Sequence, residues 1–177
     1  DYQFGFSDFY TQSDSGDQVI KYKFDNDVFY AGIAYLKNEE ADNISQNEGF
    51  DLNFGVRFSG IDLTAFYADV DDSTVINVEA RYALTDAVSL AISYATGDNE
   101  KDDTIDAYGI AGVYQLDGKT TLAAGWANVD TEGDHANDVY INASYAFSKF
   151  VNVYVELGAS DDDDNELGYA TGMQVSF

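Results

Sequence analysis

Charged side chains in this sequence recur two positions apart inside otherwise apolar runs. The charged residues concerned are Lys21 and Lys23 in DQVIKYKF, Arg57 in FDLNFGVRF, and Glu79 and Arg81 in TVINVEARY. Residues two apart project from the same face of an extended strand. We therefore expect these charges to share one face of a sheet, while the apolar residues between them occupy the other. Fixed charges placed in this way could set an electrostatic field along a polar surface and act on nearby ions.

Residues for covalent or acid–base catalysis do not form a recognisable group. His135 is the only histidine and stands in the acidic segment DTEGDHAND, where a solvated loop residue is a better interpretation than a general base. The sequence has no cysteine and no glycine-rich phosphate loop before a helix. The net charge of -25 argues against nucleic acid as a partner, since binding phosphates requires a basic surface. We expect a protein that is not an enzyme.

Apolar and polar residues alternate with a period of two along most of the chain. In VSLAISYA, for example, Val, Leu, Ile and Tyr alternate with Ser and Ala. Proline, which interrupts strand ladders, is absent. The pattern predicts eleven strands, at residues 17–24, 28–37, 48–58, 61–70, 74–82, 88–95, 105–116, 120–129, 138–147, 150–159 and 167–177.

The connections between these strands alternate in length. The short ones are 25–27, 59–60, 83–87, 117–119 and 148–149, and the longer ones are 38–47, 71–73, 96–104, 130–137 and 160–166. The longer connections and their flanks carry most of the acidic residues, as in GDNEKDDTID and DDDDNE. An up-and-down antiparallel meander explains this alternation, with short turns at one end and long acidic loops at the other.

The two strand faces differ in a way that is unusual for a soluble β-sandwich. One face is large and apolar, with residues such as Ile20, Tyr22, Leu52 and Phe54, and the other is small and polar with little charge. An outer-membrane barrel has an apolar outward face, a polar lumen, short periplasmic turns and long outer loops. Aromatic residues near the strand ends fit its two girdles: Phe24, Phe58, Tyr82, Phe147 and Phe177 at one end, and Tyr67, Tyr94 and Tyr108 at the other. We expect an all-β transmembrane barrel, with a soluble acidic β-domain as the alternative.

The end of the chain resembles a known family. The segments YINASYAFSKFVNVYVELGAS and ELGYATGMQVSF resemble the last three strands of the general diffusion porins of Gram-negative outer membranes, and ARYALTDAVSLAISYATGD resembles a porin hairpin. The terminal Phe177 is similar to the terminal phenylalanine that the barrel-assembly machinery reads in outer-membrane barrels. The resemblance implies a water-filled channel for passive diffusion of small hydrophilic solutes and ions.

The resemblance also implies a position for this chain within a larger barrel. General porins have about sixteen strands, and the odd count here puts residue 1 on the long-loop side. Residues 1–16 would then be the end of a constriction loop folded into the barrel, and 17–177 the strands that follow it in one barrel domain. The alternative is a complete small barrel of ten or twelve strands, acting as an adhesin or receptor through its acidic loops.

Porins of this family place basic wall residues across the pore from acidic residues of the constriction loop. By this resemblance Lys21 and Lys23 are the first candidates for the pore lining, followed by Arg81, with Arg57 and Glu79 on the same face. Asp8 and Asp14 would belong to the acidic side. The alternative is that these charges only keep the lumen hydrated, or pair locally as Glu79 and Arg81 could.

The resemblance further implies a homotrimer in the bacterial outer membrane, with a periplasmic C-terminus, extracellular acidic loops and contacts with lipid and lipopolysaccharide. The loop carboxylates could bind Ca²⁺ or Mg²⁺, which prefer oxygen ligands. No loop has the spacing of an EF-hand, so solvation is the alternative. The candidate ligands are Asp161, Asp162, Asp163, Asp164 and Glu166; we expect no other metal and no cofactor.

Overall fold

Eleven strands form a single antiparallel sheet in the computed structural model, which describes residues 18–37, 48–70, 73–98, 104–161 and 167–176. The strands are β1 (Gln18–Asp25), β2 (Phe29–Lys37), β3 (Glu48–Phe58), β4 (Ile61–Val70), β5 (Ser73–Ala83), β6 (Val88–Asp98), β7 (Thr104–Gln115), β8 (Thr120–Thr131), β9 (Asp134–Ser148), β10 (Val151–Ser160) and β11 (Leu167–Val175). Each strand pairs with the next one along the chain, so the order in the sheet is the order in the sequence. The predicted up-and-down meander is confirmed.

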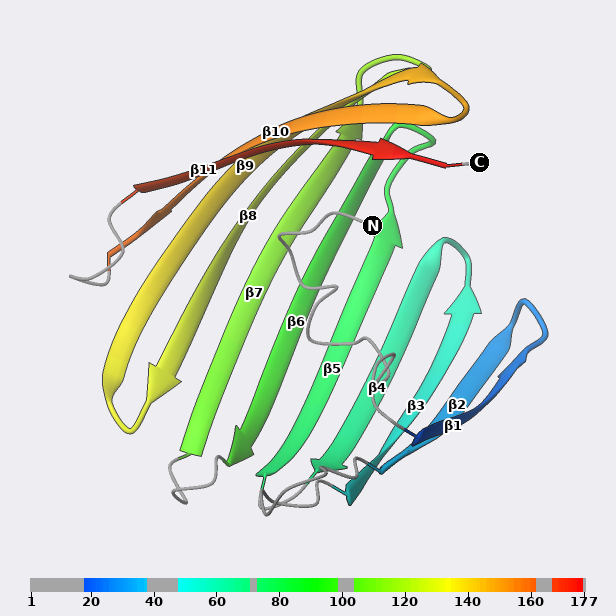
Figure 1. The fold of residues 1–177 in the computed structure, drawn as a ribbon, viewed down its shortest axis with the longest axis vertical. Helices are drawn as coiled ribbons and strands as arrows, with labels where there is room; N and C mark the ends of the chain where they lie inside the picture. The colour runs from blue at the N-terminus through cyan, green and yellow to red at the C-terminus, as the bar shows by residue number, and fades with distance from the viewer. Residues whose placement is uncertain (1–17, 38–47, 71–72, 99–103, 162–166, 177) are drawn as a thin grey trace.

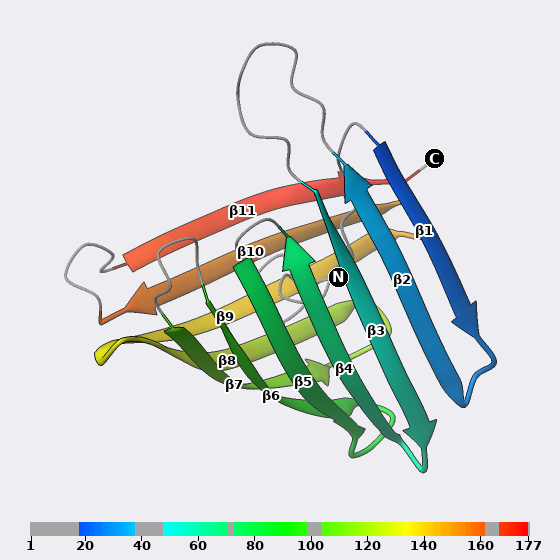
Figure 2. The same cartoon turned by 90° about the horizontal axis from the view of Figure 1, so that it is seen from below.

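The sheet curves strongly into an open trough (Figures 1 and 2). In the part of the chain that the structure describes, β1 and β11 are the two edges of this sheet. Strand tilt and twist of this kind are what bend an antiparallel sheet towards a barrel. We call the concave side the inner face and the convex side the outer face.

The two faces reverse the usual burial pattern of a soluble protein. Large apolar side chains are exposed on the outer face, among them Ile20 at 75% and Phe54 at 55% of their maximal accessible area. Polar side chains are buried on the inner face, where Asn77 is 1% and Glu156 is 6% exposed. Alternation along each strand produces this segregation, because successive side chains point to opposite sides. Such an apolar exterior is suited to lipid.

Aromatic residues on the outer face gather near the strand ends, as the sequence predicts. Phe24, Phe58, Tyr82 and Phe147 lie towards the short turns and are between 43% and 63% exposed. Towards the other end, the rings of Tyr94 and Tyr108 contact each other across β6 and β7, with centroids 5.0 Å apart. These positions match the two interfacial girdles of membrane barrels.

The prediction of a long loop at residues 130–137 is wrong. Strands β8 and β9 continue through it and are joined only by Glu132 and Gly133. Both turn residues have positive φ, at 53° and 97°, which is the conformation of a two-residue hairpin turn of type I′. The carboxylate of Asp130 accepts a hydrogen bond from the Gly133 N–H at 2.7 Å. His135 therefore lies in β9 and not in a loop.

Candidate functional site

Register places the two lysines of β1 on the inner face. Lys21 is opposite Ala34 and Lys23 is opposite Gly32, and Ala34 is in turn opposite Asp51. Residues directly opposite each other in adjacent strands share a face, so both lysines lie on the side where Asp51 is buried. Both side chains are exposed. Their placement is the one that strand alternation predicts; their role as pore lining remains a prediction.

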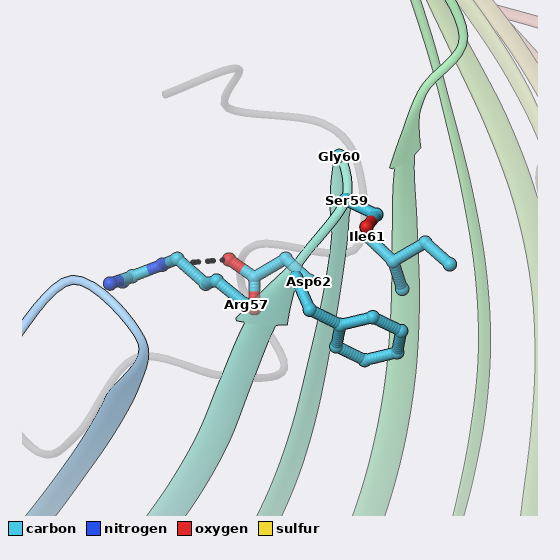
Figure 3. A pocket seen from close by; sticks show the side chains of 6 residues that line it. Arg57, Ser59, Gly60, Ile61 and Asp62 are labelled. Carbon is cyan, nitrogen blue, oxygen red and sulfur yellow. Dashed lines mark hydrogen bonds and ion pairs between the residues drawn. The ribbon is translucent and has the colours of Figure 1, made fainter.

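Arg57 lies at the centre of a hydrogen-bonded cluster at the short-turn end of the inner face. Its Nη1 donates to both carboxylate oxygens of Asp25, at 2.8 and 3.0 Å. Its Nε donates to Asp62 Oδ2 at 3.2 Å, the contact drawn in Figure 3. The guanidinium also lies over the ring of Tyr30, 4.2 Å from the centroid. Tyr30 donates its hydroxyl hydrogen to Asp62 Oδ1 at 2.6 Å and also contacts the Thr64 hydroxyl. The cluster thus connects β1, β2, β3 and β4.

An open pocket of about 360 Å³ adjoins this cluster at the turn between β3 and β4 (Figure 3). It is lined by Arg57, Phe58, Ser59, Gly60, Ile61 and Asp62. Ser59 and Gly60 have positive φ, so the turn itself is a tight two-residue hairpin. The pocket presents one arginine and one carboxylate that are already paired with each other.

Arg81 of β5 extends the row of charged inner-face residues that begins with the cluster around Arg57. It is opposite Asp62 in register, and its Nε donates to the carboxylate of Glu79 on its own strand. Glu79 is 6% exposed, whereas Arg81 is exposed. The local pairing of Glu79 with Arg81 that the sequence offered as an alternative is therefore present. Each arginine of the inner face has at least one carboxylate partner, which reduces the field it can project.

The inner face of the later strands carries a polar pair that the sequence analysis did not select. Asn142 and Glu156 are opposite each other on β9 and β10, and Asn142 Nδ2 donates to Glu156 Oε2 at 3.3 Å. Both residues are at most 6% exposed. The signal that could have identified Glu156 is the one used for Glu79, namely an acid alternating with apolar residues in VNVYVEL.

Several predicted site residues lie outside the described residues. They are Asp8, Asp14, Asp162, Asp163, Asp164, Glu166 and Phe177. Asp161 is described, and its carboxylate accepts hydrogen bonds from the backbone and the side chain of Asn137, the latter at 2.8 Å. These bonds hold the pKa of Asp161 below its ordinary value. These hydrogen bonds therefore join Asp161, the residue that follows β10, to Asn137 of β9.

In the described ranges, no three side chains among histidine, aspartate and glutamate come together in a way that could hold a metal ion. His135 Nδ1 lies 3.5 Å from Asp130 Oδ2, and its side chain is exposed. No helix long and apolar enough to span a membrane occurs in the described part of the chain.

An antiparallel sheet with an apolar convex face and a charged concave face defines the class of outer-membrane β-barrel proteins. A family model described as Gram-negative porin matches residues 1–165. The chain belongs to the Gram-negative porin family. Family and fold place it in the outer membrane.

Two curated relatives support this assignment. The chain is 31% identical to the porin-like protein H of Photobacterium profundum, over 92% of this chain and 59% of the relative. It is 27% identical to outer membrane protein U of Vibrio parahaemolyticus, over 90% of this chain and 50% of the relative. The chain therefore spans between half and three fifths of the length of these relatives.

Solved structures share the fold. A loop-deletion mutant of OmpT from Vibrio cholerae matches with a TM-score of 0.76 and 23% identity, over 99% of this chain and 68% of that one. An anion-selective porin from Comamonas acidovorans matches with a TM-score of 0.66 and 17% identity, over 90% of this chain and 58% of that one. At these identities the likeness establishes the barrel architecture alone.

Proposed function

We propose that this chain forms most of the wall of a water-filled channel for passive diffusion of small hydrophilic solutes and ions. The observation that carries the proposal is the charged and polar inner face beneath an apolar outer face. A closed lumen requires strands beyond those described, because β1 and β11 leave two open edges. A barrel of about sixteen strands, with further strands between these edges, would satisfy both.

The same proposal gives the barrel an orientation and partners. The short-turn end would face the periplasm and the long acidic connections the outside, which is the usual arrangement in bacterial outer-membrane barrels. A homotrimer, contacts with lipopolysaccharide, and recognition of Phe177 by the barrel-assembly machinery follow from the family resemblance. Ca²⁺ or Mg²⁺ bound by the carboxylates of residues 161–166 remains part of the proposal.

The experiment that tests the channel uses neighbouring residues of opposite orientation. Ala111 lies on the inner face, opposite Ala91 and Gly125, whereas Ile110 is 51% exposed on the outer face. The whole porin is reconstituted in planar bilayers with either residue replaced by cysteine. A bulky, membrane-impermeant thiol reagent should reduce conductance through Ala111→Cys channels and leave Ile110→Cys channels unchanged.

The outcomes separate the channel from a receptor barrel. Absence of stepwise conductance in the unaltered protein would refute the channel and favour the adhesin or receptor alternative. Conductance that the reagent reduces at Ile110→Cys, and not at Ala111→Cys, would show that the two faces have been assigned the wrong way round.

A further inference from the structure

Tyrosine rings on the inner face lie flat over glycines of the neighbouring strand. Tyr140 on β9 is opposite Gly125 on β8, and Tyr154 on β10 is opposite Gly172 on β11. A Cβ atom added at Gly125 would lie 2.4 Å from Tyr140 Cε1, and one added at Gly172 would lie 2.5 Å from Tyr154 Cζ. Both distances are far below van der Waals contact, so each ring occupies the space that a side chain on the glycine would need.

Tyr140 has a glycine on each side, and its ring covers only one of them. Gly158 on β10 is also opposite Tyr140, yet a Cβ at Gly158 would meet only Val139 O at 3.7 Å, an ordinary contact. The ring is therefore folded specifically towards β8. On β11, similarly, a Cβ at Gly168 would come no closer than 4.0 Å to the nearest atom, Gly158 O.

Small residues on the neighbouring strands adjoin both rings, so the position of each ring affects the profile of the wall. Ala123, Ala127, Gly158 and Ala170 lie on the inner face beside the two tyrosines, together with the polar residues Asn142 and Glu156. A tyrosine that stood upright on such a wall would be the largest obstruction on it. A tyrosine that lies along the wall leaves the lumen open.

We propose that Gly125 and Gly172 determine the clearance of the channel on this side, because they let Tyr140 and Tyr154 lie against the wall. The inference rests on the proposed channel function and adds specificity-determining residues to it. Restoring a 3.4 Å contact at Gly125→Ala requires the ring edge to move by 3.4 − 2.4 = 1.0 Å. The backbone blocks movement outward, and the space over Gly158 offers the ring a lateral route. With Gly158→Ala added to occupy that space, the ring displaced by Gly125→Ala moves into the lumen.

The test measures the size of the channel in the whole porin. Single-channel conductance and exclusion of uncharged polyethylene glycols are recorded at about 1 M KCl, where charges are screened within ~3 Å. A ring that moves about 1 Å into the passage narrows it. We expect Gly125→Ala combined with Gly158→Ala to conduct less than the unaltered channel and to exclude polymers that the unaltered channel admits. Gly158→Ala, on the other side of the same tyrosine, should match the unaltered channel.

Removing the ring tests whether it is the cause. In a Tyr140→Ala background there is no ring to displace, so adding Gly125→Ala to Gly158→Ala should change neither readout. Gly172→Ala, with Gly168→Ala as its control, repeats the comparison on β11 should Gly125→Ala not assemble. Equal conductance for each glycine variant and its control, or an effect of Gly125→Ala that persists without Tyr140, overturns the inference and leaves the channel intact. An unaltered protein that does not conduct overturns both.

Discussion

Neutralising the β1 lysines should make the channel more selective for cations. The variant is Lys21→Gln with Lys23→Gln, and both residues lie on the inner face. Taking a distance of roughly 8 Å from lysine to a passing ion, each charge contributes about 0.5 kcal/mol in water and about 0.2 kcal/mol after screening at 0.1 M salt. Two lysines acting oppositely on K⁺ and Cl⁻ change the permeability ratio by at most about fivefold, and we expect roughly two- to fivefold.

The measurement is the reversal potential under a KCl gradient, for the whole porin in planar bilayers. The shift should largely disappear near 1 M salt, where the Debye length of about 3 Å is well below the distance to the ion. Arg81→Gln combined with Glu79→Gln is the matched control. It removes two inner-face charges that are paired with each other and leaves the net charge unchanged.

Two results would refute this reasoning. An unchanged or more anion-selective potential in the lysine variant would mean that Lys21 and Lys23 do not face the conducting path. A shift of equal size in the control variant would mean that local pairing does not cancel the field of the arginine.

Three further predictions concern stability, measured by urea unfolding in detergent or lipid. Tyr30→Phe keeps the ring under the guanidinium but loses the hydrogen bond to Asp62, and should cost about 1 kcal/mol. In an Asp62→Ala background, which lacks the acceptor, Tyr30→Phe should cost clearly less. Gly133→Ala should cost about 1 kcal/mol because φ is 97°, while Gly118→Ala, where an added Cβ also meets nothing within 4 Å, should be close to neutral. Backbone N–H groups of Lys119 and Thr120 lower the pKa of the Asp117 carboxyl below its ordinary value. The charged carboxylate therefore stabilises the fold above the ordinary pKa, and this stabilisation is lost as the pH falls through the lowered pKa of the folded protein. The urea concentration at the unfolding midpoint should therefore decrease below about pH 4. Asp117→Asn should lack that part of the drop, and an unchanged pH profile would contradict the assignment.

Strand positions were predictable because the two sides of this sheet meet different solvents. Residues 48–58 and 61–70 were predicted as strands with the bounds that β3 and β4 have in the structure. Each strand must present apolar residues to lipid at every second position, so the sequence pattern has little freedom. The turn at Ser59 and Gly60 adds the glycine that a type I′ hairpin favours.

The prediction of strand ends failed where β8 and β9 extend beyond the apolar part of the outer face. Residues 130–137 carry acids at nearly every second position, which is typical of a loop, yet they belong to β8 and β9. Outside the lipid both faces of a hairpin meet water, so alternation no longer distinguishes strand from loop. Only the turn signal at Gly133 remained, and the density of charge around it obscured that signal.

The candidate site could be predicted only in part, because alternation fixes a face and does not fix a partner. Lys21, Lys23 and Arg57 were assigned to the correct side of the sheet from spacing alone. That Asp25 and Asp62 would meet at Arg57 depends on the register of β1 to β4, which spans 32 residues of sequence between Asp25 and Arg57. The tyrosine–glycine contacts depend on register in the same way.

Strand register determines which of the charged residues that make up the net charge of -25 face the proposed lumen, and so which of them can affect ion selectivity. Many of the acids lie in or beside the long connections, where salt screens them from the lumen beyond about 10 Å at 0.1 M. On the inner face, Arg57 and Arg81 are joined to Asp25, Asp62 and Glu79, so their charges act as one strip and not singly. The lysines of β1 and carboxylates such as Glu156 of β10, on the other side of the trough, add further fixed charges to the two walls of the proposed lumen. A transverse field between these two walls, and not the total charge of the chain, is what a passing ion would experience.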